Sequence, residues 1–191
     1  MVNCIAVLSV KGMSEYPYGS REDRKMVAEM PMEKLLDYVF LQIRNIWRVD
    51  GLYFLGIEKR FGIEAATELD AGVWECMAAI EAKNLQRTFR VGENPDVVTI
   101  IDLLRKSSWA LDQPFKTFGI GKKRVTLGID RCRIQEARLI KGLCEFPCKK
   151  VRFGYLRNFA KTLNPKVKVN CLVCPPDKHP GDLWCKWEFT M

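Results

Sequence analysis

Histidine is almost absent from this sequence, since His179 is the single histidine among 191 residues. The chain therefore cannot build a zinc site from a His-x-x-x-His helix, from three histidines, or from two histidines and a carboxylate. A Ser–His–Asp triad would have to use His179, which stands directly before Pro180. A phosphate-binding loop of the form G-x-x-x-x-G-K-[ST] is also missing. Cysteine is consequently the residue type that best indicates where chemistry takes place.

Long apolar runs are absent as well. No stretch approaches the roughly 20 residues that span a bilayer. Residues 4–10 are apolar, but they lack the preceding basic region and the following small-residue cleavage site of a signal peptide. These absences predict a cytoplasmic protein with no membrane partner, in which eight cysteines do not form a disulfide framework.

The remaining composition is that of a folded domain, with 48% hydrophobic and 28% charged residues. We expect a loose N-terminal arm over residues 1–30 and a single domain over 31–191. The net charge of +8 divides unevenly: residues 1–115 carry −3 and residues 116–191 carry +11. Such a basic half could bind nucleic acid, with Lys122, Lys123, Arg124, Lys149 and Lys150 as its densest points. A solvated basic face is the commoner arrangement, so nucleic acid ranks third among the candidate partners.

Residues 31–115 have the spacing of a helical half. Apolar residues recur at helical intervals from Pro31 to Trp47, and Asp50-Gly51 predicts a break. We expect further helices over about 52–61, ended near Gly62, then over about 63–89 and over 97–109.

Residues 116–191 change to the period of a sheet half. Alternation predicts strands over 125–129 and 133–140, and a helix follows over about 149–162. With a final hairpin, the order predicts an α+β fold: a helical half, then a mostly antiparallel sheet with one inserted helix. If 133–140 is a strand, Cys132, Ile134 and Glu136 share its inward face.

The final hairpin has a register that separates apolar from polar side chains. Pairing Cys171 with Cys185 places Val169 opposite Trp187 and puts the partners on one face. This register predicts that Cys171 and Cys185 are cross-strand neighbours, with Cys174 and His179 in the connecting loop.

Five of the eight cysteines lie within about forty residues, from Cys144 to Cys185, and two of them form the C-x-x-C of Cys171 and Cys174. Zinc takes four soft ligands in a tetrahedron, and an iron–sulfur cluster uses the same ligand type. Buried thiols that only pack are the alternative. The candidate metal ligands are Cys132, Cys148, Cys171, Cys174, Cys185 and His179.

A reactive thiol competes with the metal site. Cys148 precedes two lysines at an expected helix N-terminus, where the helix dipole favours a thiolate. An inward-facing Glu136 could act as its general base, or could instead pair with Arg138 or Arg152. In the helical half, Asp70, Trp74 and Glu81 share one stripe, which marks either a boundary between core and solvent or the wall of a ligand pocket.

Two parts of the sequence resemble a known group of proteins. Residues 50–58, 61–66, 73–75 and 80–82 look like the N-terminal part of proteins grouped with L-2-amino-thiazoline-4-carboxylic acid hydrolase. The tail, residues 171–177 and 184–189, looks like an uncharacterised cytosolic prokaryotic branch of that group. The layout of the second half is more loosely similar to the four-vinyl-reductase type of ligand-binding domain. The resemblance implies a small-molecule-binding α+β fold, often a homodimer.

Three functions follow from these observations. The first is a small-molecule-binding domain with a cysteine-ligated zinc site near the final hairpin. The second is a hydrolase of a small cyclic amide or thiazoline, acting on C–N bonds through a cysteine thiolate or a metal-bound water. The third is nucleic-acid binding through the basic half.

Overall fold

The structure, a computed structural model, describes residues 18–191. Its helices are α1 (Arg21–Ala28), α2 (Met32–Thr88), α3 (Val97–Leu104), α4 (Ser108–Asp112), α5 (Arg133–Ile140) and α6 (Cys148–Leu163). Its strands are β1 (Lys116–Ile120), β2 (Arg124–Ile129), β3 (Lys168–Val173) and β4 (Cys185–Thr190). The predicted α+β fold is therefore confirmed. Within residues 18–191, no helix is both long enough and apolar enough to cross a membrane.

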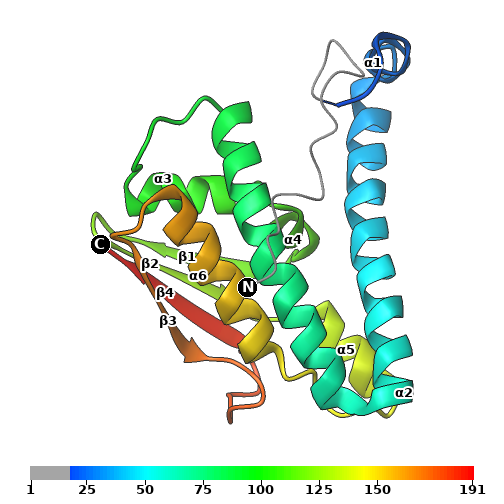
Figure 1. Ribbon diagram of the computed structural model, residues 1–191, viewed down its shortest axis with the longest axis vertical. Coiled ribbons are helices and arrows are strands. Elements are labelled where there is room, and N and C mark those ends of the chain that lie inside the picture. Colours follow the sequence, from blue (N-terminus) through cyan, green and yellow to red (C-terminus); the bar gives the residue numbers. More distant parts are fainter. Residues whose placement is uncertain (1–17) are drawn as a thin grey trace.

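The four strands form one antiparallel sheet in the order β1-β2-β4-β3. Helix α6 packs against β3 and against α2, so it lies between the sheet and the long helix (Figure 1). Alternate residues of β2 and β4 are buried, among them Leu127, Trp187 and Phe189. They meet Tyr155 and Phe159 of α6 in the core. Burial of this apolar surface is the main stabilising contribution to the domain.

Helix α2 is a helical hairpin with a kink at Gly62 in place of a loop. Gly62 has φ 88° and ψ 166°, a conformation that is essentially confined to glycine. The first arm, residues 32–61, and the second arm, residues 63–88, run side by side near the kink and diverge away from it (Figure 1). The predicted stop near Gly62 is confirmed.

The predicted break at Asp50-Gly51 is wrong, since the first arm continues through both residues. Asp50 Oδ1 accepts a hydrogen bond of 2.9 Å from Trp74 Nε1 on the second arm. Tertiary contacts of this kind outweigh the roughly 1 kcal/mol that a glycine costs inside a helix.

Residues 133–140 are helix α5, so the predicted strand is wrong. The segment contains the good helix formers Gln135, Glu136, Ala137 and Arg138. Two of its polar side chains are buried and fully engaged. Gln135 forms two 2.8 Å hydrogen bonds with the backbone of Phe146, and Arg138 forms two of 2.8 Å with Glu58 of α2. Because polar side chains face inward here, the apolar alternation misled the assignment.

The final hairpin has the predicted faces but a different register. Cys171 lies opposite Trp187 and Val169 opposite Phe189, a shift of two residues from the prediction. A shift of two keeps every side chain on its face, whereas a shift of one would reverse them all. An irregularity between Cys171 and Val173 then pairs Val173 with Lys186. Cys171 and Cys185 are therefore not cross-strand partners.

Part of the predicted N-terminal arm is ordered as α1. Ser20 caps this helix, because its Oγ accepts a hydrogen bond of 3.1 Å from the backbone N–H of Asp23. Strand β1 was not predicted. Residues 1–17 lie outside the described part of the chain, so the expectation for them stays a prediction.

We predict that Gly62→Ala destabilises the domain by about 1–3 kcal/mol, because alanine cannot adopt the Gly62 backbone without strain. Gly72→Ala is the matched control: Gly72 lies within the same helix, nothing lies within 4 Å of an added Cβ, and alanine should stabilise it by up to about 1 kcal/mol. Chemical denaturation of both variants measures the difference. Equal effects of the two substitutions would contradict the assigned role of Gly62.

Candidate metal and ligand site

Four cysteines from four separate segments converge at one corner of the domain. Cys132 precedes α5, Cys148 is the first residue of α6, Cys174 follows β3 and Cys185 opens β4. The Cys174 thiol forms hydrogen bonds with both Cys148 and Cys185. Cys132 lies close enough to Cys148 and Cys185 to feel their charge. None of the four is in a disulfide. We call these four residues the thiol cluster.

Backbone hydrogen bonds hold the thiol cluster together. The N–H of Lys149 donates to Pro175 O at 2.8 Å, which ties the start of α6 to the loop after β3. The N–H of Trp184 donates to Ile129 O at 2.9 Å, which ties the start of β4 to the end of β2. Main-chain pairing thus brings together the segments that carry Cys148, Cys174 and Cys185.

The C-x-x-C is divided by the shift in β3. Cys174 hydrogen-bonds within the thiol cluster, whereas Cys171 stays on the strand opposite Trp187 and is half-buried. Cys171 nevertheless lies close enough to Cys185 and Cys148 to feel their charge. Burial raises the pKa of Cys171 to about 11. His179 lies in the loop between β3 and β4, as predicted. Its ring centroid is 4.7 Å from that of Trp184, with 38° between the ring planes, and its Nε2 is 3.5 Å from Glu145 Oε1.

Three of the clustered thiols, those of Cys132, Cys148 and Cys174, differ in acidity. The hydrogen bond from Cys174, and then the positive charge of Arg152, lower the pKa of Cys148 to about 7. Donating hydrogen bonds to its neighbours raises the pKa of Cys174 well above its usual range. Burial raises the pKa of Cys132 to about 12. Cys148, at the positive end of the α6 dipole, therefore ionises before Cys132 and Cys174.

The cluster does not form a metal-ligand shell in this packing. Among residues 18–191, no group of three or more His, Cys, Asp or Glu side chains is arranged to hold a metal ion. The thiols hydrogen-bond to one another and do not surround a common centre.

Arg152 lies one turn beyond Cys148 and is only 2% exposed. Its guanidinium stacks over the rings of Trp109 at 4.4 Å, Tyr155 at 5.0 Å and Trp47 at 5.7 Å. It also hydrogen-bonds to Cys148, yet its Nε and Nη1 have no partner within the described residues. A buried cation with unpaired N–H groups is costly unless an anion lies nearby.

The sequence analysis names Arg152 only as a possible partner of Glu136, although a signal for a buried charge is present. Arg152, Tyr155, Leu156 and Phe159 follow the i, i+3, i+4, i+7 spacing of one helix face. The other three are buried apolar or aromatic residues. An arginine within an apolar stripe is a candidate for a buried charge.

A pair of carboxyl groups lies beside Arg152. Asp50 and Asp70, on the two arms of α2, hydrogen-bond to each other. Burial, and then the charge of Asp50, raise the pKa of Asp70 to about 7. Trp74 stacks on Trp47 with ring centroids 4.4 Å apart. The two carboxyl groups of Asp50 and Asp70 therefore share a proton near neutral pH.

The predicted pocket residues Asp70, Trp74 and Glu81 lie on the inner side of the second arm. Glu81 accepts hydrogen bonds of 2.7 Å from the Tyr155 hydroxyl and from the backbone N–H of Ser108. All three side chains thus contact protein groups, as the boundary interpretation expects, and their role in ligand binding stays a prediction.

Glu136 lies on the solvent side of α5. Its carboxylate accepts hydrogen bonds of 3.0 and 3.1 Å from Arg131, which holds its pKa below the usual range. The inward orientation that suggested a general base depended on a strand that does not form, and the partner is Arg131, which was not considered.

A hollow of about 640 Å³ lies at the start of α6. It is lined by Ile63 and Thr67 of α2 and by Phe153 of α6. Pro147, just before α6, and Pro176, in the loop after β3, complete its apolar lining. Its charged residues are Glu64, Glu68, Glu145, Lys149, Lys150 and Asp177. Lys149 pairs with Asp177 at 2.6 Å, and Lys150 pairs with Glu68. Lys149 and Lys150 thus face carboxylates, and Arg124 pairs with Glu188. Lys122 and Lys123 are exposed at the turn between β1 and β2.

The sequence of residues 28–191 matches a family model described as a family of unknown function, DUF6125. The chain belongs to the DUF6125 family. The matched range covers α2 to β4 and includes the whole thiol cluster. Comparison with curated proteins gives no match. The family description does not mention the hydrolase group that the sequence resembles, so that resemblance stays a prediction.

One solved structure is similar in outline to this DUF6125 protein. It is the crystal structure of the phenol-responsive sensory domain of the transcription activator PoxR with phenol. The TM-score is 0.47 at 15% sequence identity, and the match covers 75% of this chain and 72% of that chain.

We predict that Asp70→Asn becomes more stable than the wild type as the pH rises. The pKa of Asp70 is raised in the fold, so its stabilising contribution is complete below about pH 4 and is lost as the pH rises through about 7. Asparagine does not ionise, so the variant should gain roughly 2–4 kcal/mol on the wild type between pH 4 and pH 8. Urea denaturation across this range measures the gain.

Asp102→Asn is the control, since Asp102 is an exposed carboxylate paired with Lys106. The difference between this control and the wild type should be small, as surface ion pairs contribute little. If the two variants show the same pH dependence, the buried carboxyl pair does not behave as described.

Proposed function

We propose that this protein is a small-molecule-binding domain whose ligand occupies the hollow at the start of α6. We further propose that the thiol cluster holds a zinc ion beneath that hollow.

The observation that carries the proposal is that the hollow and the thiol cluster share backbone. Pro147 and Lys149 line the hollow on either side of Cys148. Pro176 and Asp177 line it directly after Cys174. A constraint on Cys148 and Cys174 therefore acts on the walls on both sides. Hollows of this size are typical of small-molecule sites.

The chemistry of the residues supports zinc. Four unbridged thiols from four segments are the donor set of a closed structural zinc site, in which metal binding joins distant parts of the chain. Thiolates carry negative charge, and Arg152 contacts Cys148 with two N–H-bearing nitrogens still unpaired. A guanidinium in that place offsets the charge of the ligands. Zinc binding requires the thiols to ionise and to exchange their mutual hydrogen bonds for the metal.

The lining of the hollow supports a ligand with both charges. Glu64 and Glu145 add negative charge to the two lysine–carboxylate pairs, so a simple anion would meet a net acidic wall. A small amino-acid-like molecule satisfies both kinds of group, with its amine facing a glutamate and its carboxylate facing Lys149 or Lys150. Ile63 and Phe153 offer contact to its apolar part.

A thiol hydrolase is the second candidate, because one observation favours it. The lowered pKa of Cys148 makes this thiol a nucleophile near neutral pH when no metal is bound. Glu136 does not contribute as its base, since Arg131 engages it. A metal-bound water would need an open coordination position, which a zinc ion with all four cysteines as ligands lacks.

We predict about one zinc per chain in protein purified without added metal, measured by elemental analysis. Cys148→Ser and Cys174→Ser should lose the zinc and several kcal/mol of stability, because metal binding and folding are coupled. Cys144→Ser is the matched control, since this free cysteine is exposed and lies outside the thiol cluster. Cys171→Ser tests the strand thiol beside the cluster, and both variants should keep the metal.

Two results would contradict this assignment. Zinc loss in Cys171→Ser would restore the original C-x-x-C interpretation. Metal-free wild-type protein whose Cys148 reacts with iodoacetamide at pH 7.5 would favour the thiol nucleophile instead.

We predict that L-2-amino-thiazoline-4-carboxylate, a probe with both charge types, binds in isothermal titration calorimetry. Glu64→Gln and Lys150→Met should each weaken binding about 10- to 100-fold, because each removes a charge-assisted contact. Lys161→Met, on an exposed face of α6, is the control. A thiazoline that lacks the carboxylate should bind more weakly. Equal affinity of all variants would exclude the hollow, and consumption of the probe during titration would favour the hydrolase.

A further inference from the structure

One face of the sheet carries no helix in the described part of the chain. Helices α6 and α3 pack against β3 and β2 on the face that holds Leu127 and Trp187 (Figure 1). Because side chains alternate along a strand, the residues between these core positions lie on the opposite face, which we call the outer face. Its side chains are polar or charged, among them Thr117, Thr126, Lys168, Asn170, Lys186 and Glu188.

The order of the strands brings five cationic side chains together at one end of the sheet. Strands β2 and β3 are both antiparallel to β4, which lies between them, so the two begin at the same end. Their first residues, Arg124 and Lys168, both pair with Thr190 and are about 10 Å apart. Lys122 and Lys123 lie in the turn just before β2, and Lys166 lies two residues before β3. We call this group the basic end: Lys122, Lys123, Arg124, Lys166 and Lys168.

Four of these five cations have no counter-charge within the protein. Arg124 pairs with Glu188, the only carboxylate at an outer-face position of the four strands. The other four are exposed and form no ion pair with any residue from 18 to 191: Lys122, Lys123, Lys166 and Lys168. Four like charges within roughly 15 Å produce a positive potential that attracts a polyanion. The hollow at the start of α6 differs, since Lys149 and Lys150 face carboxylates there.

The neutral side chains beside the basic end favour a nucleic acid over other polyanions. Thr126, Asn170 and Thr190 occupy neighbouring outer-face positions, and hydroxyl and amide groups donate hydrogen bonds to phosphate oxygens. The two rows of paired residues that contain them hold no apolar or aromatic side chain on this face. A protein interface usually has an apolar or aromatic centre, and single-stranded nucleic acid binds by stacking its bases on aromatic rings. A double strand needs neither.

We propose that the basic end binds double-stranded DNA through its phosphates, without preference for sequence. B-form DNA carries one charge for about every 1.7 Å of its axis, so a patch of roughly 15 Å faces several phosphates. Contacts to phosphates carry no sequence information. Double-stranded RNA is recognised across two successive minor grooves, a span of about 16 base pairs that exceeds this patch.

This DNA site lies apart from the ligand hollow. Helix α6, about 24 Å long, begins at the hollow with Cys148, and its last residue, Leu163, is three residues before Lys166. Strand β4 likewise starts at the thiol cluster with Cys185 and ends with Thr190 beside the basic end. DNA binding therefore does not depend on the proposed ligand or zinc, and either can fail without the other.

Fluorescence anisotropy of the full chain with a labelled DNA duplex of about 24 base pairs tests the site. The logarithm of the association constant should fall against the logarithm of salt concentration with a slope of about −3 to −4, as expected for four phosphate contacts. The double variants Lys122→Gln with Lys123→Gln, and Lys166→Gln with Lys168→Gln, should each make this slope shallower by about 2 and weaken binding at least about 10-fold. Because all four lysines are exposed, the circular dichroism of both variants should be unchanged.

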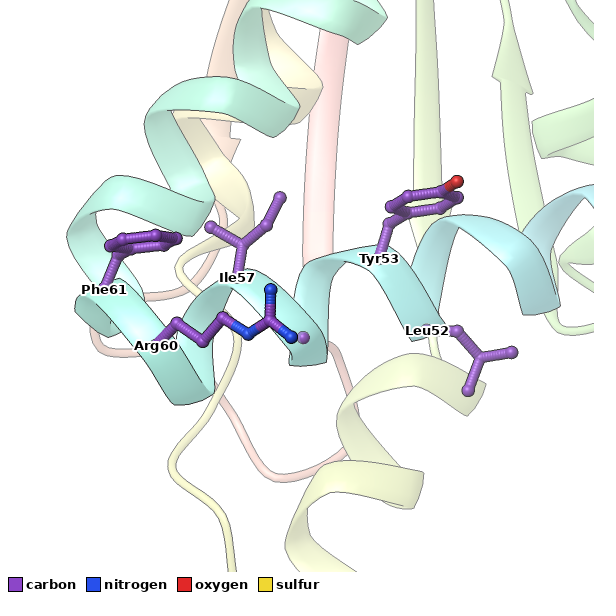
Figure 2. Close-up of a pocket in the computed structure, with 6 residues that line it drawn as sticks. Leu52, Tyr53, Ile57, Arg60 and Phe61 are labelled. Carbon is purple, nitrogen blue, oxygen red and sulfur yellow. The ribbon is translucent and has the colours of Figure 1, made fainter.

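The double variant Lys59→Gln with Arg60→Gln is the matched control, since it removes the same net charge far from the sheet. Arg60 lines a hollow of about 430 Å³ near the kink of α2, together with Ile57 and Phe61 (Figure 2). Lys59 and Arg60 are both exposed, and the kink and the C-terminal end of β4 lie on opposite sides of the molecule (Figure 1). The control should keep the wild-type slope, and two duplexes of unrelated sequence should bind the wild type equally.

Four results would overturn the proposal. One is a lack of duplex binding at low salt, and another is an equal loss of binding in the control and in the lysine variants. The third is a preference of more than about 10-fold for one duplex sequence, which phosphate contacts cannot give. The last is equal or tighter binding of a single strand, of an RNA duplex or of vesicles containing phosphatidylserine, because each would identify a different partner.

Discussion

The enclosure of the Arg152 guanidinium by aromatic rings connects the parts of this domain that carry its chemistry. One side chain of α6 contacts Trp47 on the first arm of α2, Trp109 on α4 and Cys148 in the thiol cluster. Trp47 in turn stacks on Trp74, which holds Asp50. The position of the arms, the acidity of Cys148 and the shared proton of Asp50 and Asp70 therefore depend on where this cation lies.

Such an arrangement is stable only because its charges balance locally. A buried guanidinium without counter-charge would cost several kcal/mol. Asp50 and Asp70 together hold about one negative charge near neutral pH, and Cys148 ionises in the same range. The ring faces add a favourable cation–π contribution. Asp70 and Cys148 thus both change protonation state near neutral pH, and a bound metal would keep Cys148 as the thiolate.

Hydrophobic period predicted the fold class, the stop at Gly62, the start of α6 at Cys148 and the two faces of the hairpin. It could not predict the hairpin register, because a shift of two residues leaves every face unchanged. It failed at 133–140, where Gln135 and Arg138 are buried through hydrogen bonds that no apolar pattern records. The approach of Cys132 to Cys148 and Cys185 is a tertiary result, because β2 ends at the corner where α6 and β4 begin.

The kink at Gly62 has a mechanical consequence. Two rigid helices meet there at a single residue, with no flexible loop to absorb a change of angle. The first arm of 30 residues is about 45 Å long, so a rotation of 5° at its base displaces its tip by about 4 Å. The α2 hairpin thus has the geometry of a lever, with a short side at the hollow beside the start of α6 and a long side at the exposed end. A small change in spacing at the thiol corner would be amplified along the arm.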